Sequence, residues 1–252
     1  MFDNTRKVVM SDTADDNKRL QYLQAMGVDV WQPRQAADID SDNLGLITQL
    51  NDTEIGDLDA QWERLRQTVA ECERCELHQT RRQTVFGAGN RHADWMLIGE
   101  APGQQEDAQG EPFVGPAGQL LTEMIRALGY SREQVYITNI LKCRPPNNRD
   151  PHSEEISACS DFLAQQISWV KPKIILAVGR VAAQNLLHSK ASLAKLRGIV
   201  HKWDDIPVIV IYHPAYLLRS LLEKRKAWQD LKFARHVYQD LQESYAQDMG
   251  KS

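Results

Sequence analysis

Four short apolar runs constrain the fold of this chain more than any other feature of its sequence. They cover Trp95–Ile98, Val135–Ile140, Ile174–Val178 and Val208–Tyr212. Helical patterns separate or follow them at residues 117–128, 154–169, 180–188 and 226–243. Short buried strands that alternate with helices predict an α/β fold with a parallel sheet covered on both faces.

Polar motifs stand where three of these strands end. The segment Gly99–Gly103 follows the first run, Asn139 lies near the end of the second, and His213 follows the fourth. Ligands of parallel sheets bind at the carboxyl ends of the strands. We therefore expect the three segments to converge on one pocket.

The charge is unevenly distributed along the 252 residues. The net charge of −4 is unusual for a protein that binds nucleic acid, but the first 60 residues are strongly acidic and the remainder is mildly basic. That remainder neither establishes nor excludes a phosphate-binding face. Because the sequence has no apolar run of about 18 residues and no signal peptide, we expect a cytoplasmic protein without a membrane span.

The acidic segment also predicts the domain organisation. Residues 1–60 are expected to be a partly disordered leader and linker, with a short helix over 15–27, because 36–60 are rich in Asp, Asn and Thr. A folded domain is expected over 61–245 and a tail over 246–252. The segment Tyr22–Arg34 is a candidate for docking a repair or replication partner.

The four cysteines of the chain are a candidate metal centre. They are Cys72, Cys75, Cys143 and Cys159, of which only the first two form a close pair. Four are too few for a disulfide scaffold in a chain of this length. The second pair is spaced too widely for a zinc ribbon, whereas four thiolates suit an iron–sulfur cluster. Spacing alone leaves open that these are unrelated buried thiols.

Four sequence blocks accompany the cysteines. They read GEAPGQQED followed by PFVG at 99–115, TNILKCRPP at 138–146, NRDP at 148–151 and HPAYLLR at 213–219. In this order and spacing, the blocks and cysteines resemble the family 4, thermostable-type bacterial uracil-DNA glycosylases, over roughly residues 66–238.

The resemblance implies a fold and an activity. The fold is a three-layer α/β sandwich with a central four-stranded parallel sheet, and a structural [4Fe–4S] cluster on the four cysteines. The activity is that of a monofunctional glycosylase. It flips uracil out of single- or double-stranded DNA and hydrolyses the N-glycosidic bond, which leaves an abasic site for base-excision repair. Members of the family are usually monomers, so a monomer is expected.

Two residues are candidates for holding the base. Phe113 would stack on the uracil ring, although a core phenylalanine is the alternative. Asn139 would accept a hydrogen bond from uracil N3–H and donate one to O4, a pattern that cytosine does not match. A turn-forming or capping asparagine is its alternative.

Catalytic roles are expected for a histidine and two acids. His213 would donate to uracil O2 as negative charge develops there, in either protonation state. Glu100 would orient the water and offset positive charge on the sugar, with Glu106 as a second acidic candidate. The backbone of Glu100 and Ala101 is an alternative holder of the water. Pro102 completes the expected uracil pocket.

The DNA backbone would be held by basic and polar side chains. The candidates are Lys142, Arg144, Asn148, Arg149 and Arg219. Leu217 or Leu218 could fill the gap left by the flipped nucleotide, with simple packing as the alternative.

Two other function classes compete with the enzyme. One is a DNA-binding module that keeps the fold and cluster without turnover, and the other is an iron–sulfur electron carrier. Cleavage of a uracil-containing oligonucleotide would exclude the first. The base-pocket motifs have no purpose in the second.

Overall fold

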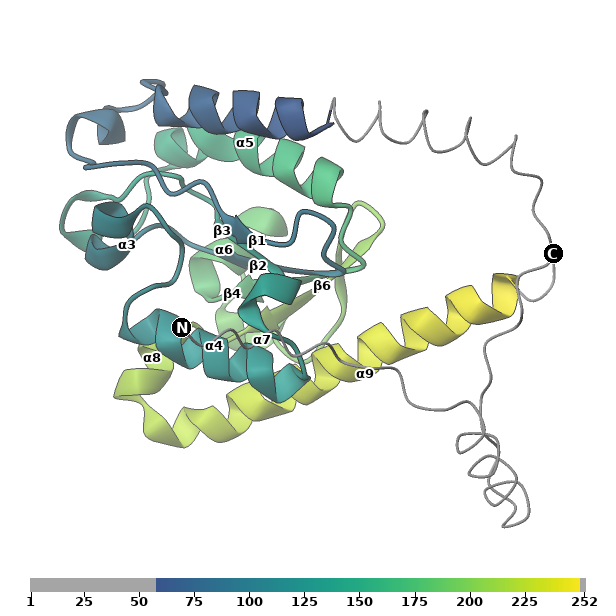
Figure 1. The fold of residues 1–252 in the computed structure, drawn as a ribbon. Helices are drawn as coiled ribbons and strands as arrows, with labels where there is room; N and C mark the ends of the chain where they lie inside the picture. Colours follow the sequence, from purple (N-terminus) through teal and green to yellow (C-terminus); the bar gives the residue numbers. More distant parts are fainter. Residues whose placement is uncertain (1–57, 250–252) are drawn as a thin grey trace, which may run out of the picture. The chain divides into compact units, whose positions relative to one another are not determined.

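The computed structural model describes residues 58–249, which are built around one six-stranded sheet (Figure 1). Residues 1–57 of the expected leader, with its helix over 15–27 and the proposed docking segment, lie outside the described residues. Residues 58–60, which were assigned to the leader, already belong to the first helix of the folded domain. The strands are β1 (Ala88–Gly89), β2 (Trp95–Gly99), β3 (Tyr136–Asn139), β4 (Ile174–Val178), β5 (His201–Trp203) and β6 (Ile206–Ile211). Their order across the sheet is β1-β3-β2-β4-β6-β5.

The four expected strands are the four parallel strands at the centre of the sheet. β2 pairs with β3 and β4, and β4 pairs with β6, all in parallel. The two additional strands, β1 and β5, are antiparallel edges of two and three residues. They are too short and too exposed to produce an apolar pattern, so the sequence did not predict them.

Helices cover both faces of the sheet, as expected for a three-layer α/β fold (Figure 1). They are a helix over residues 58–70, α3 (Gln104–Gln109), α4 (Pro116–Leu128), α5 (Ser153–Val170), α6 (Arg180–Leu186), α7 (Leu193–Leu196), α8 (Pro214–Arg219) and α9 (Lys224–Met249). Short 3-10 turns η1 (Glu76–Gln79), η2 (Arg132–Gln134), η3 (Pro146–Asn148) and η4 (Leu221–Glu223) lie between them. No helix in this part of the chain is long and apolar enough to cross a membrane.

The strands form two separate cores because neighbouring side chains point to opposite faces. Met96 and Ile98 pack with the helix over 58–70 and with α5, whereas Trp95 and Leu97 pack with α4 and α9. All residues of β2, β3 and β4 are buried, and so are the last four residues of β6. This burial on both sides explains why the strands read as continuous apolar runs.

The strand order places a binding site. The chain runs from β2 to β3 on one side of β2, and then crosses to β4 on the other side. The segment after β2 leads toward β3, and the segment after β4 leads toward β6, so the two diverge at the carboxyl ends of the strands. Parallel sheets bind ligands at such a point of divergence.

Candidate active site

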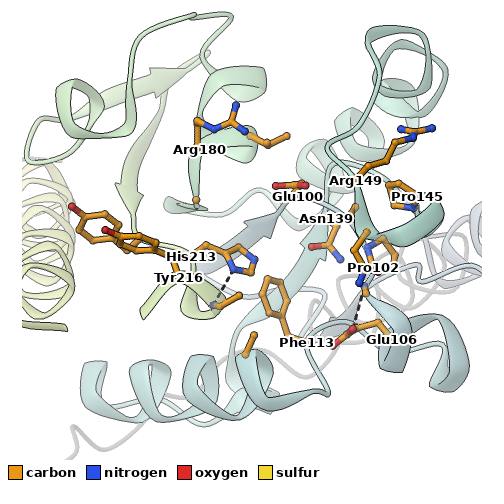
Figure 2. A pocket seen from close by; sticks show the side chains of 18 of the residues that line it. Glu100, Pro102, Glu106, Phe113, Asn139, Pro145, Arg149, Arg180, His213 and Tyr216 are labelled. Carbon is orange, nitrogen blue, oxygen red and sulfur yellow. Dashed lines mark hydrogen bonds between the residues drawn. The ribbon is translucent and has the colours of Figure 1, made fainter. Parts of the chain in front are cut away.

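A cavity of about 600 Å³ opens at the carboxyl ends of all four parallel strands (Figure 2). Its wall is built from the segments that follow the strands: Glu100–Gly103 after β2, Asn139 at the end of β3, Gly179–Val181 after β4, and Tyr212 and His213 after β6. Three of these segments were expected to converge. The fourth, after β4, was not among the predicted segments, and it also borders the cavity.

Asn139 presents an unsatisfied acceptor to the cavity. The residue is 2% exposed, and its side-chain Oδ1 is buried with no hydrogen-bond partner among the described residues. Its backbone is fixed, because it pairs with Gly99 in the sheet and its carbonyl accepts a bond of 2.8 Å from Lys142 Nζ. A buried polar atom without a partner costs about 1–3 kcal/mol, so this position favours a ligand that donates to it.

Phe113 covers the cavity from a strained loop. Its φ of 54° is in the left-handed region, which an aromatic residue rarely adopts. The backbone of this loop packs directly against Gly118 in α4. A Cβ added at Gly118 would lie 1.8 Å from the Phe113 carbonyl oxygen. Arg132 donates to the neighbouring Pro112 carbonyl. Such strain is retained where the surroundings over-determine a functional conformation.

Gly99 leaves room for the two base-contacting candidates. A Cβ at this position would lie 2.4 Å from Asn139 Oδ1 and 2.5 Å from Phe113 Cζ. The two side chains therefore approach each other over a backbone that has no side chain of its own. The Phe113 ring also lies 5.7 Å from the His213 ring, between centroids.

Glu106 has both carboxylate oxygens occupied by backbone donors. Oε1 accepts from Val114 and Gly115 at 2.9 and 3.0 Å, and Oε2 accepts from Gly103 at 3.1 Å. The side chain thus ties the segment after β2 to the Phe113 loop. The sequence suggested Glu106 as a second acidic catalyst, and these contacts describe a group that positions the pocket wall.

Glu100 faces the cavity with a perturbed acidity. Burial and the nearby charge of Asp150 raise its pKa to about 7, and Arg180 opposes the rise. Arg180 donates to Asp150, so the two form an ion pair beside the carboxyl group. A carboxyl group that titrates near neutrality suits a base for water.

His213 caps α8 and is held in one tautomer. Its Nδ1 accepts a hydrogen bond of 3.1 Å from the backbone N–H of Ala215. Burial and the nearby charge of Arg219 together lower the pKa of the imidazole to about 4, against a weaker opposing effect of Glu106. The ring is therefore neutral at physiological pH, and because Nδ1 accepts, the proton resides on Nε2. The sequence had left the protonation state open.

The prediction that Lys142 contacts phosphate is wrong. The side chain is 1% exposed, and its ammonium group donates to Thr138 Oγ1, the Asn139 carbonyl and Gln166 Oε1 at 2.7 to 2.8 Å. A lysine with all three donors satisfied inside the core cannot reach a DNA backbone.

The other phosphate candidates differ in their exposure and in whether another side chain already pairs with them. Arg219 is exposed at the end of α8, and Asn148 is exposed in η3 with a φ of 54°. Arg144 donates to Asn148 Oδ1 at 2.7 Å. Arg149 is paired through both terminal nitrogens with Glu155. Arg149 therefore holds the loop before α5, and Arg219 is the candidate with the most accessible charge.

The two leucine candidates are distinguished by burial. Leu217 is 1% exposed and belongs to the core between α4, α8 and α9. Leu218 is 42% exposed, next to Leu221 and Leu222 at 64% and 91%. Leu217 is therefore a packing residue, which was the alternative to a wedge. Leu218 is the leucine of the pair that is exposed at the surface.

The four cysteines come together from three segments of the chain. Cys143 and Cys159 are buried in one core, and Cys72 and Cys75 pack against that core. Burial raises the pKa of the Cys143 thiol to about 11, Arg81 opposes the rise, and the nearby thiols of Cys159 and Cys75 add to it. The thiols are free, and they lie close enough for their charges to interact.

Two N–H groups point at these sulfur atoms. Arg81 donates to Cys143 Sγ at 3.2 Å, and the backbone N–H of Lys142 donates to Cys159 Sγ at 3.4 Å. Within residues 58–249, no three or more His, Cys, Asp or Glu side chains are already arranged around a metal position. The donor chemistry of four thiols with N–H···S contacts nevertheless fits a thiolate-bound cluster.

Two further side chains that border the cavity, those of Arg180 and Tyr216, were not among the predicted site residues. Arg180 is paired with Asp150, 30 residues away in the sequence, and Tyr216 follows His213 by one helical turn. The Gly179-Arg180 pair could have indicated the site, since Gly179 has a φ of 93° and lies against His213, so that a Cβ would approach His213 Cβ to 2.9 Å.

Comparison with known proteins adds independent evidence. The profile of the Uracil DNA glycosylase superfamily matches residues 86–232. A type-4 uracil-DNA glycosylase of Archaeoglobus fulgidus is 48% identical over 158 residues, which cover 60% of this chain and 79% of the relative. Those of Saccharolobus solfataricus and Thermotoga maritima are 47% and 46% identical, and the matches cover 62% and 60% of this chain and 79% and 80% of the relatives.

Proposed function

Because this chain belongs to the uracil-DNA glycosylase superfamily, among relatives of the type-4 branch, we propose that its cavity removes uracil from DNA. The observation that carries the proposal is the Oδ1 atom of Asn139, which is buried beside the Phe113 ring and has no hydrogen-bond partner within residues 58–249. Together they offer one flat apolar face and one in-plane acceptor, which suit a flipped pyrimidine.

Asn139 selects uracil by hydrogen-bond polarity. Its Oδ1 accepts from N3–H, and its amide nitrogen donates to O4. Cytosine presents an acceptor at N3 and a donor at the fourth ring position, so both groups would meet like partners. The fixed backbone of Asn139 prevents the side chain from moving away to relieve this mismatch, and unmatched buried groups cost about 1–3 kcal/mol each.

His213 stabilises the leaving base. When the bond between uracil N1 and sugar C1′ breaks, the electron pair stays with the base and its charge spreads to O2. The neutral imidazole, with its proton on Nε2, donates a hydrogen bond to that oxygen. Donors fixed at developing charge act mainly in the transition state, where they contribute most.

Glu100 receives the proton of the attacking water. As water adds to C1′, the carboxylate orients it, offsets the positive charge on the sugar and takes one proton. The pKa of about 7 allows this group to be ionised in a substantial fraction of molecules at neutral pH. Ala101 and Pro102 form the adjacent wall. Glu106 holds the wall and the Phe113 loop together, which makes it a positioning residue.

The DNA strand is held around the cavity mouth. Arg219, Arg144 and Asn148 are the groups that we propose for phosphate contacts, and Arg149 supports them through its pairing with Glu155. Leu218 is the apolar wedge that occupies the space of the flipped nucleotide. Both single- and double-stranded uracil-containing DNA would be substrates.

We further propose that Cys72, Cys75, Cys143 and Cys159 hold a [4Fe–4S] cluster. Their gathering in one core and the N–H···S contacts of Arg81 and Lys142 support this. A bound cluster supplies rigidity and takes no part in the hydrolysis, which has no redox step. Cys143 lies four residues after Asn139, so the cluster would steady the strand end that carries the base selector.

The same proposal includes a cell compartment and an oligomeric state for the enzyme. The free thiols suit the reducing cytoplasm, which is the compartment that we propose. We propose that the enzyme acts as a monomer. A partner in repair or replication would dock on the leader, outside the described residues.

A glycosylase assay tests the function directly. A single-uracil oligonucleotide is incubated with the protein, and abasic product is cleaved with alkali. We expect cleavage that falls by orders of magnitude in Asn139→Ala and His213→Ala. A preparation that carries its brown cluster and cleaves nothing would reject the catalytic function, and the DNA-binding module would replace it.

A further inference from the structure

A column of stacked groups borders the cavity on the side away from Phe113. The guanidinium carbon of Arg197 lies 4.1 Å from the centre of the Tyr212 ring. On that ring lies Tyr216, with centroids 5.2 Å apart and planes inclined by 23°. Figure 2 shows Tyr216 on the opposite side of His213 from Phe113, so the column is separate from the proposed uracil position.

The base of this column is rigid. Arg197 donates to both carboxylate oxygens of Asp230 at 2.7 and 2.8 Å, and Asp230 is 4% exposed. Arg197 also donates to the Lys226 carbonyl at 3.2 Å. The anchored guanidinium of Arg197 thus supports one face of the Tyr212 ring.

The outer end of the column is open. Tyr216 is 38% exposed even though one face rests on Tyr212, and it lines the same cavity as Asn139 and His213. Two apolar side chains, Val181 and Leu193, also line this cavity. A flat ring with an apolar surround is the usual platform for a nucleobase.

Charge around the column suits a nucleotide more than an isolated base. Arg219, which is exposed, and Arg180, which is paired with Asp150, both line the cavity. Arg219 is therefore the cation that is available to a phosphate. The cavity of about 600 Å³ extends beyond the space between Phe113 and His213. Its lining thus includes aromatic, apolar and cationic groups besides the proposed uracil contacts, which match the faces of one further nucleotide.

We propose that Tyr216 is a stacking platform for the nucleobase next to the target uracil in the same strand. This rests on the proposed glycosylase function and adds a second base-binding subsite to it. The cation beneath Tyr212 polarises the stacked rings, and every base has a flat face to offer. The subsite therefore senses the presence of a neighbouring base and tolerates its identity.

The test uses three single-stranded oligonucleotides that contain one uracil. One is intact, one carries a tetrahydrofuran abasic analogue immediately 5′ of the uracil, and one carries it immediately 3′. The full-length protein is assayed for kcat/KM on each. We expect one of the two abasic substrates to be cleaved between about five-fold and about a hundred-fold less efficiently, which is the range of base–aromatic stacking.

Variants assign this dependence to the tyrosine. Tyr216→Leu keeps an apolar side chain without a flat face, and we expect it to cleave all three substrates with nearly equal efficiency. Tyr216→Phe keeps the ring and should keep the dependence. A residue that only packs α8 would lower kcat/KM equally on the three substrates.

The outcomes separate the two proposals. Equal kcat/KM of the wild-type protein on all three substrates would overturn the subsite, and this result needs no variant. Retention of the full dependence by a folded Tyr216→Leu protein would also overturn the assignment to Tyr216. Failure of the wild-type protein to cleave even the intact oligonucleotide would instead reject the glycosylase function.

Discussion

The Nδ1 atom of His213 accepts a hydrogen bond from the backbone N–H of Ala215 across the first turn of α8. This contact can form only while Nδ1 is unprotonated, so the cap of the helix and the state of the catalytic ring are coupled. Protonation of Nδ1 would point its N–H group at the backbone N–H group of Ala215, and the hydrogen bond would be lost. The same local structure that begins α8 therefore keeps the imidazole neutral.

His213 should remain neutral down to a pH of about 4 in the folded protein. Because its folded pKa lies below the ordinary value of 6.5, the stability it contributes is complete above pH 6.5 and is lost as the pH falls toward 4. We expect His213→Asn to show a smaller loss of melting temperature over this range. An NMR titration that gives an imidazole pKa above 6 would contradict the assignment.

Glu100 should impose a pH dependence on catalysis. With a pKa of about 7, kcat/KM is expected to rise as the pH increases through neutrality, because the carboxylate is the active form. Glu100→Gln should lower kcat/KM by about 10²- to 10⁴-fold and abolish this rise. Glu106→Gln is the matched control, and it should retain a rise near the same pH.

The stability of the Glu100 variant should change in the opposite direction from its activity. A carboxyl group whose folded pKa is raised stabilises the protein below its ordinary pKa of 4.5, and this contribution is lost as the pH rises through 7. Glu100→Gln should therefore melt at a higher temperature than the wild type at pH 8. Equal melting temperatures at pH 8 would mean that the carboxyl group is well solvated.

Gly99→Ala should block the uracil pocket with little effect on the fold. The new Cβ would lie 2.4 Å from Asn139 Oδ1 and 2.5 Å from Phe113 Cζ, so both side chains must move from their positions. We expect kcat/KM on a uracil oligonucleotide to fall at least about tenfold, the equivalent of 1.4 kcal/mol. Circular dichroism and the melting temperature should remain close to those of the wild type, which would assign the loss of activity to the pocket and not to unfolding.

The sequence predicted the parallel sheet and three of the four cavity walls, because buried strands leave a strong apolar signal and polar motifs followed them directly. It did not predict β1 or β5, whose pairing is a backbone property of two or three residues. The Arg180–Asp150 pair and the Tyr212–Tyr216 stack depend on how separate segments meet, which no local pattern encodes.

Lys142 shows how a local pattern can mislead. It stands in a basic segment beside Arg144 and Arg149, and such segments usually face solvent or phosphate. The chain turns inward at this point because Leu141 and Cys143 are core residues, and the lysine between them is carried into the interior. Only the three acceptors that surround its ammonium group make this burial tolerable.

Lys142→Met should therefore destabilise the protein without changing how binding depends on salt. The loss of the ammonium group removes a donor from Thr138 Oγ1, the Asn139 carbonyl and Gln166 Oε1, of which Gln166 Oε1 still accepts from Thr138. A buried group left without a partner costs about 1–3 kcal/mol. The relief from burying a charge offsets part of this. We expect the free energy of unfolding in urea to fall by about 2–4 kcal/mol, against little change for the exposed Lys232→Met.

The salt dependence distinguishes this structural role from a phosphate contact. Each phosphate contact that is lost reduces the slope of log K against log salt by about one. For Lys142→Met we expect the slope for a uracil oligonucleotide to equal that of the wild type, and for Arg219→Ala we expect it to decrease. A reduced slope in a Lys142→Met protein of unchanged stability would return the lysine to the DNA interface.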